Sequence, residues 1–163
     1  MKYFAYGSNM SLLRLKERVP SAKKLEIVTL TKHQLRFNMR GDDDSGKCDS
    51  FETNNNEDRV IGSLFEIDER EKNALDRAES LGDGYDEKVV FVQNNSGEVF
   101  EALTYYAIKI DTSLQPYSWY LNHVIIGAKE TNVPAEYLAI IEAVKCIEDP
   151  DLNRDAKQRS MYA

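Results

Sequence analysis

The chain has 163 residues, a net charge of −7, 42% apolar residues and 30% charged residues. This length allows one domain with a real core, and the composition is typical of a globular protein. An acidic chain gains nothing from phosphate backbones, and no run approaches the ~20 apolar residues that span a bilayer, so the sequence argues against nucleic-acid and membrane partners.

The N-terminal segment predicts a short aromatic strand over residues 3–6, followed by a helix from about residue 10 to residue 18. Between them lies Tyr6-Gly7-Ser8-Asn9. A glycine after a strand lets the backbone approach a ligand closely, and unpaired N–H groups at a helix start favour anions. These four residues are therefore a candidate binding loop. The alternative is that Ser8 or Asn9 simply caps the helix.

Strand patterns dominate the middle of the chain. Apolar and β-branched runs predict strands over 25–30, 34–39, 47–51 and 60–67. The acidic stretch 41–45 is expected to be a solvated turn. The strands 47–51 and 60–67 are expected to pair across the polar stretch 53–58.

A helix predicted over 68–78 ends beside Glu79. A carboxylate at this end faces the negative end of the helix dipole, which opposes its ionisation. Most exposed helices have Lys or Arg at this end, and a departure from that preference points to a functional residue. In an apolar site the pKa of Glu79 would rise toward the range that suits a general base near neutral pH. The alternative is a solvated glutamate at a frayed helix end.

The C-terminal half predicts a hairpin of strands 88–93 and 99–108, then helices over 116–127 and 134–147. Tyr105 and Tyr106 are adjacent in a strand, so we expect one in the core and one facing a pocket. Residues 149–163 are polar and show no periodicity, so we expect a loose C-terminal tail after a domain that spans 1–148.

The strands and helices do not alternate as regular βαβ units, which predicts an α+β fold with an antiparallel or mixed sheet. Closure of this sheet into a barrel stays open at this point. The cysteines and histidines show no metal-ligand spacing, so no metal site is expected. The N-terminus does not resemble a signal peptide, so we expect a cytoplasmic chain with free thiols.

The order of these segments resembles the γ-glutamylcyclotransferase-like family, also called AIG2-like. Phe4 to Met10 resembles its N-terminal strand followed by Tyr-Gly-Ser-Asn, and residues 18–22 resemble its Arg-Leu-Pro-x-Ala. The run Leu-Asp-Arg-Ala-Glu at 75–79 is similar to its Leu-Asp-x-x-Glu. The similarity continues through Gly84-Tyr85 and through Gly-Ala-Lys-Glu at 127–130. One departure is Ser80, which stands where members usually have glycine.

The resemblance implies a barrel-like mixed sheet flanked by helices. It implies an enzyme that cyclises a γ-glutamyl amide to 5-oxoproline and releases the amine, without cofactor or metal. By the same resemblance Glu79 is the catalytic acid/base. The substrate would be held by Tyr6, Gly7, Ser8, Asn9, Tyr105 and Tyr120. Asn9 resembles the branch that acts on γ-glutamyl amino acids or amines, because glutathione-specific members usually have leucine there.

Two alternatives stay open. One is a non-catalytic small-molecule binding module of the same fold, which Ser80 leaves possible. The other is a cyclotransferase that acts on a γ-glutamyl group attached to a carrier. Glu79 beside an open pocket would favour the enzyme, whereas a surface ion pair of Glu79 would favour the module. The sequence does not indicate an oligomeric state.

Overall fold

The computed structural model describes residues 1–163 and contains seven strands and five α-helices. The strands are β1 Lys2–Ala5, β2 Lys23–Thr31, β3 His33–Arg40, β4 Gly46–Glu52, β5 Arg59–Glu66, β6 Tyr85–Gln93 and β7 Val99–Ala107. The helices are α1 Leu12–Arg18, α2 Lys72–Ala78, α3 Ser118–Thr131, α4 Ala135–Glu142 and α5 Leu152–Ser160. Short 3₁₀ turns, η1 Ser8–Met10 and η2 Glu69–Glu71, precede α1 and α2.

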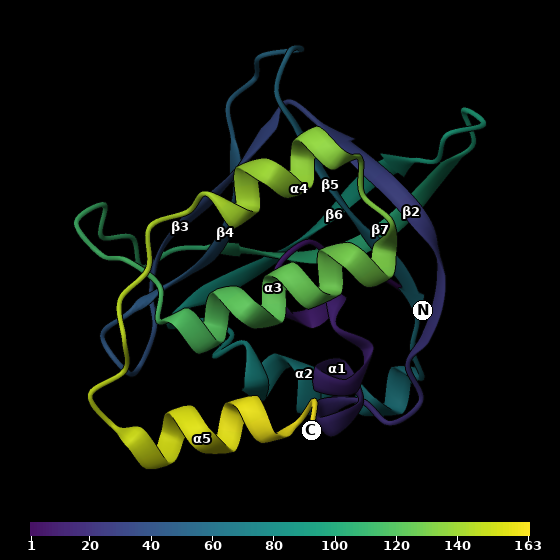
Figure 1. Ribbon diagram of the computed structural model, residues 1–163. Helices are drawn as coiled ribbons and strands as arrows, with labels where there is room; N and C mark the ends of the chain where they lie inside the picture. The colour runs from purple at the N-terminus through teal and green to yellow at the C-terminus, as the bar shows by residue number, and fades with distance from the viewer.

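Five strands close into a barrel in the order β1-β5-β2-β6-β7. Neighbours run antiparallel except β7 and β1, which close the barrel as a parallel pair with Tyr3 opposite Leu103. Strands β3 and β4 form a separate two-stranded hairpin. The predicted α+β class and the mixed, barrel-like sheet flanked by helices are thereby confirmed (Figure 1).

The predicted pairing of 47–51 with 60–67 is wrong. Strand β4 pairs with β3, and β5 lies between β1 and β2. The reason lies in the residues of β5, where Val60 to Phe65 are all buried. Such a strand presents apolar side chains on both faces and is stable only in the middle of a sheet. The turn at 41–45 instead joins β3 to β4.

Helix α3 crosses the barrel and packs against η1, α4 and α5, while α1, α2 and α5 gather at one end of the molecule (Figure 1). Gly127 allows this approach, because a Cβ atom there would lie 2.5 Å from Met10 Cβ and 2.5 Å from Ser11 N. The backbone of α3 thus rests directly on the loop after β1. No helix is both long and apolar enough to cross a bilayer.

The prediction of a loose tail over 149–163 is wrong, because α5 forms there. Asp151 caps it by accepting from the N–H of Arg154 at 3.0 Å. Buried Asp149 accepts from Arg154 Nε at 2.6 Å and from Trp119 Nε1 at 2.8 Å. Polar contacts of individual side chains, and not a buried apolar face, hold this helix in place. For this reason an apolar periodicity in the sequence could not predict it. Helix α4 also ends at Glu142, earlier than predicted.

Candidate active site

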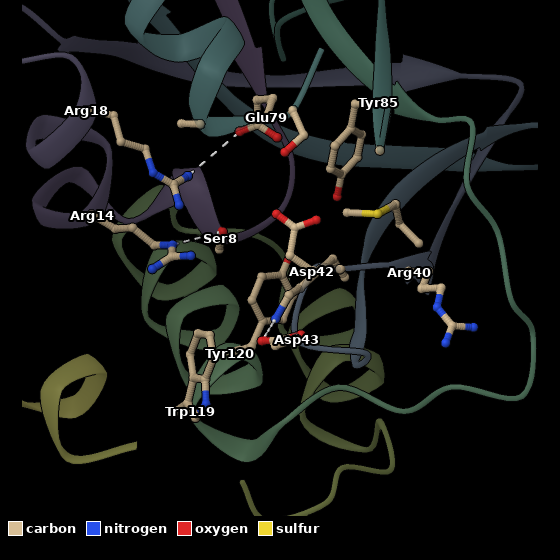
Figure 2. Close-up of a pocket in the computed structure, with 16 residues that line it drawn as sticks. Ser8, Arg14, Arg18, Arg40, Asp42, Asp43, Glu79, Tyr85, Trp119 and Tyr120 are labelled. Atoms are coloured by element: carbon tan, nitrogen blue, oxygen red, sulfur yellow. Dashed lines mark hydrogen bonds and ion pairs between the residues drawn. The ribbon is translucent and has the colours of Figure 1, made fainter. Parts of the chain in front are cut away.

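A cavity of about 230 Å³ opens between α1, the end of α2, the 41–45 turn and the start of α3 (Figure 2). Behind it lies a recess of about 30 Å³, which has room for about one water molecule. We call them the outer cavity and the inner recess. They share four lining residues: Ser8, Glu79, Tyr85 and Tyr120.

The loop after β1 forms one wall of the inner recess. A Cβ atom at Gly7 would lie 2.8 Å from Cys48 Cβ, so only glycine lets this loop approach β4 so closely. The backbone N–H of Gly7 donates to no atom of the chain. The Ser8 hydroxyl accepts from Arg14 Nε at 3.1 Å. The cap of α1 is instead Ser11, which accepts from the N–H of Arg14, so the alternative that Ser8 or Asn9 caps the helix is wrong.

Asn9 connects the loop to Glu79. Its Nδ2 donates to Glu79 Oε1 at 2.7 Å and to the Tyr3 hydroxyl at 3.0 Å. Its Oδ1 accepts from Arg18 Nη1 at 2.7 Å. Because the amide is bonded at both ends, it fixes one carboxylate oxygen of Glu79 in the cavity wall and leaves Oε2 outside these contacts.

Glu79 is the C-cap of α2, where the backbone N–H still donates to Leu75 O at 2.9 Å. Its side chain is 13% exposed and lies 3.8 Å from Arg18 Nη1. Burial raises the pKa of Glu79 above its ordinary value, while Arg18, Asn9 and Arg14 act in the opposite direction. The alternative of a solvated glutamate at a frayed end is therefore wrong, and the ion pair with Arg18 lies in the cavity wall.

The predicted tyrosines line the inner recess, with their hydroxyls engaged in bonds to the protein. The Tyr6 hydroxyl donates to Tyr105 O at 2.6 Å, and the Tyr105 hydroxyl donates to Asp76 Oδ1 at 2.6 Å. The Tyr120 hydroxyl accepts from Cys48 N at 2.9 Å. Of the adjacent pair, Tyr105 is buried and lines the recess, whereas Tyr106 is half-buried and faces outward. These aromatic rings form much of the wall of the inner recess.

Sequence reasoning missed the charged walls of the outer cavity. Arg14 and Arg18 reach into it from α1, on one face because they are four residues apart (Figure 2). That spacing was a signal available in the sequence. From the opposite side Asp42 and Asp43 line the cavity, and Asp43 accepts from Lys47 Nζ at 2.9 Å. The acidic turn is therefore part of the cavity, although it was expected to be only a solvated connection.

The backbone after Glu79 forms a left-handed helix stop. Ser80 has a φ of 50°, the N–H of Leu81 donates to Asp76 O at 3.0 Å, and the N–H of Ser80 donates to Arg77 O at 3.1 Å. This pattern is a Schellman motif, in which glycine is usual at the position of Ser80. The serine thus adopts the conformation that a glycine would adopt, and the hydrogen bonds that end α2 are intact.

We expect Ser80→Gly to stabilise the protein by roughly 0.5–1 kcal/mol, or a Tm gain of about 1–4 °C. Glycine removes the steric cost of the left-handed conformation, which exceeds the entropy that it adds to the unfolded chain. Thermal unfolding of both proteins measures the difference. Ser80→Ala keeps the Cβ atom and is the matched control. If the glycine variant were no more stable than the alanine variant, the left-handed backbone at residue 80 would carry no steric cost.

Comparison with known proteins identifies the family to which the sequence is similar. Residues 59–141 match the AIG2-like family. The chain is 30% identical to a human and 28% identical to a Bos taurus protein named gamma-glutamylcyclotransferase, each over 149 residues that cover 88% of this chain and 78% of the relative.

Solved structures share the fold. A structure named gamma-glutamyl cyclotransferase superposes with a TM-score of 0.87 at 22% identity over 98% of both chains. An uncharacterised protein from Homo sapiens gives a TM-score of 0.85 at 24% identity over 97% of both chains. YkqA from Bacillus subtilis gives 0.76 at 19% identity, over 90% of this chain and 56% of its own. The sequence match and the shared fold together show that this chain belongs to the AIG2-like family of γ-glutamylcyclotransferase-like proteins.

Proposed function

We propose that the protein is a γ-glutamylcyclotransferase, which converts a γ-glutamyl amide to 5-oxoproline and releases the amine. The observation that carries the proposal is Glu79, a carboxylate with a raised pKa at the junction of the outer cavity and the inner recess. The names of the human and Bos taurus relatives support the same class of reaction.

In this reaction the α-amine of the substrate attacks its own γ-carbonyl carbon. A C–N bond forms and closes a five-membered ring, and the proton of the amine passes to Glu79. The tetrahedral intermediate then collapses, the bond to the leaving amine breaks, and Glu79 returns the proton to that nitrogen. No water is consumed and nothing is oxidised. An α-amine with a pKa near ~8 is matched better by a carboxyl whose pKa is raised than by an ordinary one.

The remaining walls have two roles in this proposal. Holding the amine against the γ-carbonyl supplies part of the acceleration, because the loss of conformational freedom precedes the chemical step. The N–H groups of Gly7, Ser8 and Asn9 bind either the developing oxyanion or the α-carboxylate. The free N–H of Gly7 at the recess supports this role. Tyr105 and Tyr120 limit the access of water that would otherwise solvate Glu79.

A free small molecule, a γ-glutamyl amino acid or γ-glutamyl amine, is the substrate that we propose. The outer cavity of about 230 Å³ is lined by Arg14 and Arg18, whose charges suit a substrate that carries carboxylates.

The binding-module alternative predicted a surface ion pair of Glu79. The position of Glu79 in the cavity wall, with one oxygen outside the contacts to Asn9 and Arg18, favours the enzyme.

The test is 5-oxoproline release from γ-glutamyl-alanine, γ-glutamyl-ε-lysine and glutathione. We expect release from at least one of the first two at a kcat/KM above that for glutathione. The best substrate then identifies the leaving group that the outer cavity accepts. Binding of these compounds without release would support the binding module. If the compounds were neither bound nor converted, a γ-glutamyl group attached to a carrier would be the favoured substrate.

A further inference from the structure

Arg14 is a buried cation without a counter-ion. Its residue is 8% exposed and lines the outer cavity. Nε donates to Ser8 Oγ at 3.1 Å and Nη1 donates to Gln158 Oε1 at 2.9 Å, and both acceptors are neutral. Arg18, Arg40 and Lys47 around the same cavity each pair with a carboxylate, but Arg14 pairs with none.

Such a charge is costly unless an anion or further hydrogen bonds compensate it. Burial and the neighbouring Arg18 lower the pKa of Arg14 to about 10, so the guanidinium is still protonated at neutral pH. The positive charge therefore persists inside the cavity wall. A ligand that brings a carboxylate into the outer cavity supplies the counter-ion that the chain itself does not.

Helix α5 and the residues after it hold Arg14 in place with neutral groups alone. Gln158 Oε1 accepts from His123 Nε2 at 2.9 Å as well as from Arg14. Burial lowers the pKa of His123 to about 4, so the ring is neutral and its Nδ1 accepts from the Tyr162 hydroxyl at 2.6 Å. That hydroxyl in turn accepts from Ser11 Oγ at 2.9 Å. The network orients the guanidinium without neutralising it.

We propose that Arg14 binds a carboxylate of the substrate in the outer cavity, and that Gln158 and Tyr162 are positioning residues that keep Arg14 there. A γ-glutamyl amino acid offers two such groups, the α-carboxylate of the glutamyl part and the carboxylate of the leaving amino acid. The choice of a γ-glutamyl ligand rests on the proposed function, whereas the uncompensated cation is a property of the fold.

The first test measures binding by calorimetry in a Glu79→Gln background, in which turnover is expected to be slowed by about 10²- to 10⁴-fold. Adding Arg14→Gln is expected to weaken the affinity for γ-glutamyl-alanine by about 10- to 100-fold, the usual effect of losing a charged hydrogen bond. Arg40→Gln is the matched control, because Arg40 lines the same cavity but already pairs with Asp44 and Asp111; it should change the affinity less than about twofold.

A second ligand, γ-glutamyl-ethylamide, separates the two carboxylates because its leaving amine has none. If Arg14→Gln leaves its affinity unchanged, Arg14 binds the leaving-group carboxylate; an equal loss for both ligands assigns the α-carboxylate. The proposal would be overturned if Arg14→Gln left the affinity for both ligands unchanged, or if neither ligand bound to the Glu79→Gln protein that still has Arg14. Because binding is read without turnover, failure of 5-oxoproline release would contradict the proposed function and leave this result standing.

The second test keeps Arg14 and changes its partner. Gln158→Glu places a carboxylate beside Nη1, so Arg14 gains an internal counter-ion of the same shape. We expect the Tm to rise and the affinity for γ-glutamyl-alanine to fall at least about tenfold, because the ligand no longer supplies the missing charge. A purely structural role of Gln158 predicts no loss of affinity when stability rises, and that outcome would overturn the proposal even if Arg14→Gln failed to fold.

Discussion

Glu79→Gln is expected to lower 5-oxoproline release by about 10²- to 10⁴-fold, the usual contribution of a general acid–base group. The amide keeps the shape of the side chain and can still accept the hydrogen bond from Asn9 Nδ2, but it cannot take a proton from the substrate amine. Release from γ-glutamyl-alanine at saturating substrate measures the loss, and circular dichroism checks the fold. A folded variant with near-normal rates would contradict the role of Glu79.

The direction in which Glu79→Gln changes the free energy of unfolding also follows from the structure. The pKa of Glu79 is raised in the folded protein, so its contribution to the free energy of unfolding is lost as the pH rises from the unfolded pKa through the folded one. At neutral pH the ionised carboxylate is therefore unfavourable in the fold. We expect the Tm of Glu79→Gln to equal or exceed that of the wild type, which separates lost chemistry from lost folding.

The pH dependence of kcat/KM tests independently whether Glu79 is the general base. A general base must be ionised, so kcat/KM of the wild type should rise with pH through the pKa of Glu79, which lies above its ordinary value of 4.5. Arg18 lowers that pKa, so Arg18→Gln should move the acidic limb to higher pH, whereas Arg18→Lys keeps the charge and should move it less. An identical limb in all three proteins would assign the ionisation to another group.

Gly127→Ala is expected to destabilise the protein by about 2–3 kcal/mol, or roughly 5–10 °C in Tm. The added Cβ atom would lie 2.5 Å from Ser11 N and from Met10 Cβ, so α3 and η1 must separate. Ser8 and Asn9 belong to η1, and Asn9 holds Glu79. We therefore expect kcat to fall as well, because a displacement of about 1 Å in a catalytic constellation costs up to ~100-fold.

Thermal unfolding and 5-oxoproline release measure this effect together. Lys129→Ala changes an exposed side chain on the same helix and should leave both properties close to the wild type. If Gly127→Ala unfolded at the same temperature as Lys129→Ala, the close approach of α3 to the loop would not limit the size of the residue at 127.

Local features of the sequence determined most of the secondary structure. The seven strands and the helices before residue 143 follow from apolar periodicity, and the β6–β7 hairpin follows from the turn residues 94–97. The site candidates came from the order of short motifs. The structure brings Tyr6, Gly7, Ser8, Asn9, Glu79, Tyr105 and Tyr120 around one recess, and their roles in the chemistry remain proposals.

Long-range contacts decided the rest. The neighbours of β5 depend on which strands can cover two apolar faces, and the turn that follows β4 does not encode that choice. The partners of Ser8 and Asn9 are side chains on β1, on α1 and at the C-cap of α2, which no local pattern identifies. The lack of a counter-ion for Arg14 is visible only when every carboxylate around the cavity has been placed.

The C-terminal residues illustrate the physical reason. Residues 149–163 are polar, and composition alone favours a loose tail. Helix α5 forms because Asp149, Gln158 and Tyr162 each make hydrogen bonds to polar groups from distant parts of the chain. Apolar burial repeats along a helix and is therefore readable in sequence, whereas a single hydrogen bond to a buried group depends on the position of one distant atom. The sequence by itself thus determined the elements and the candidate loop, and only the tertiary structure decided what holds the charged wall of the cavity.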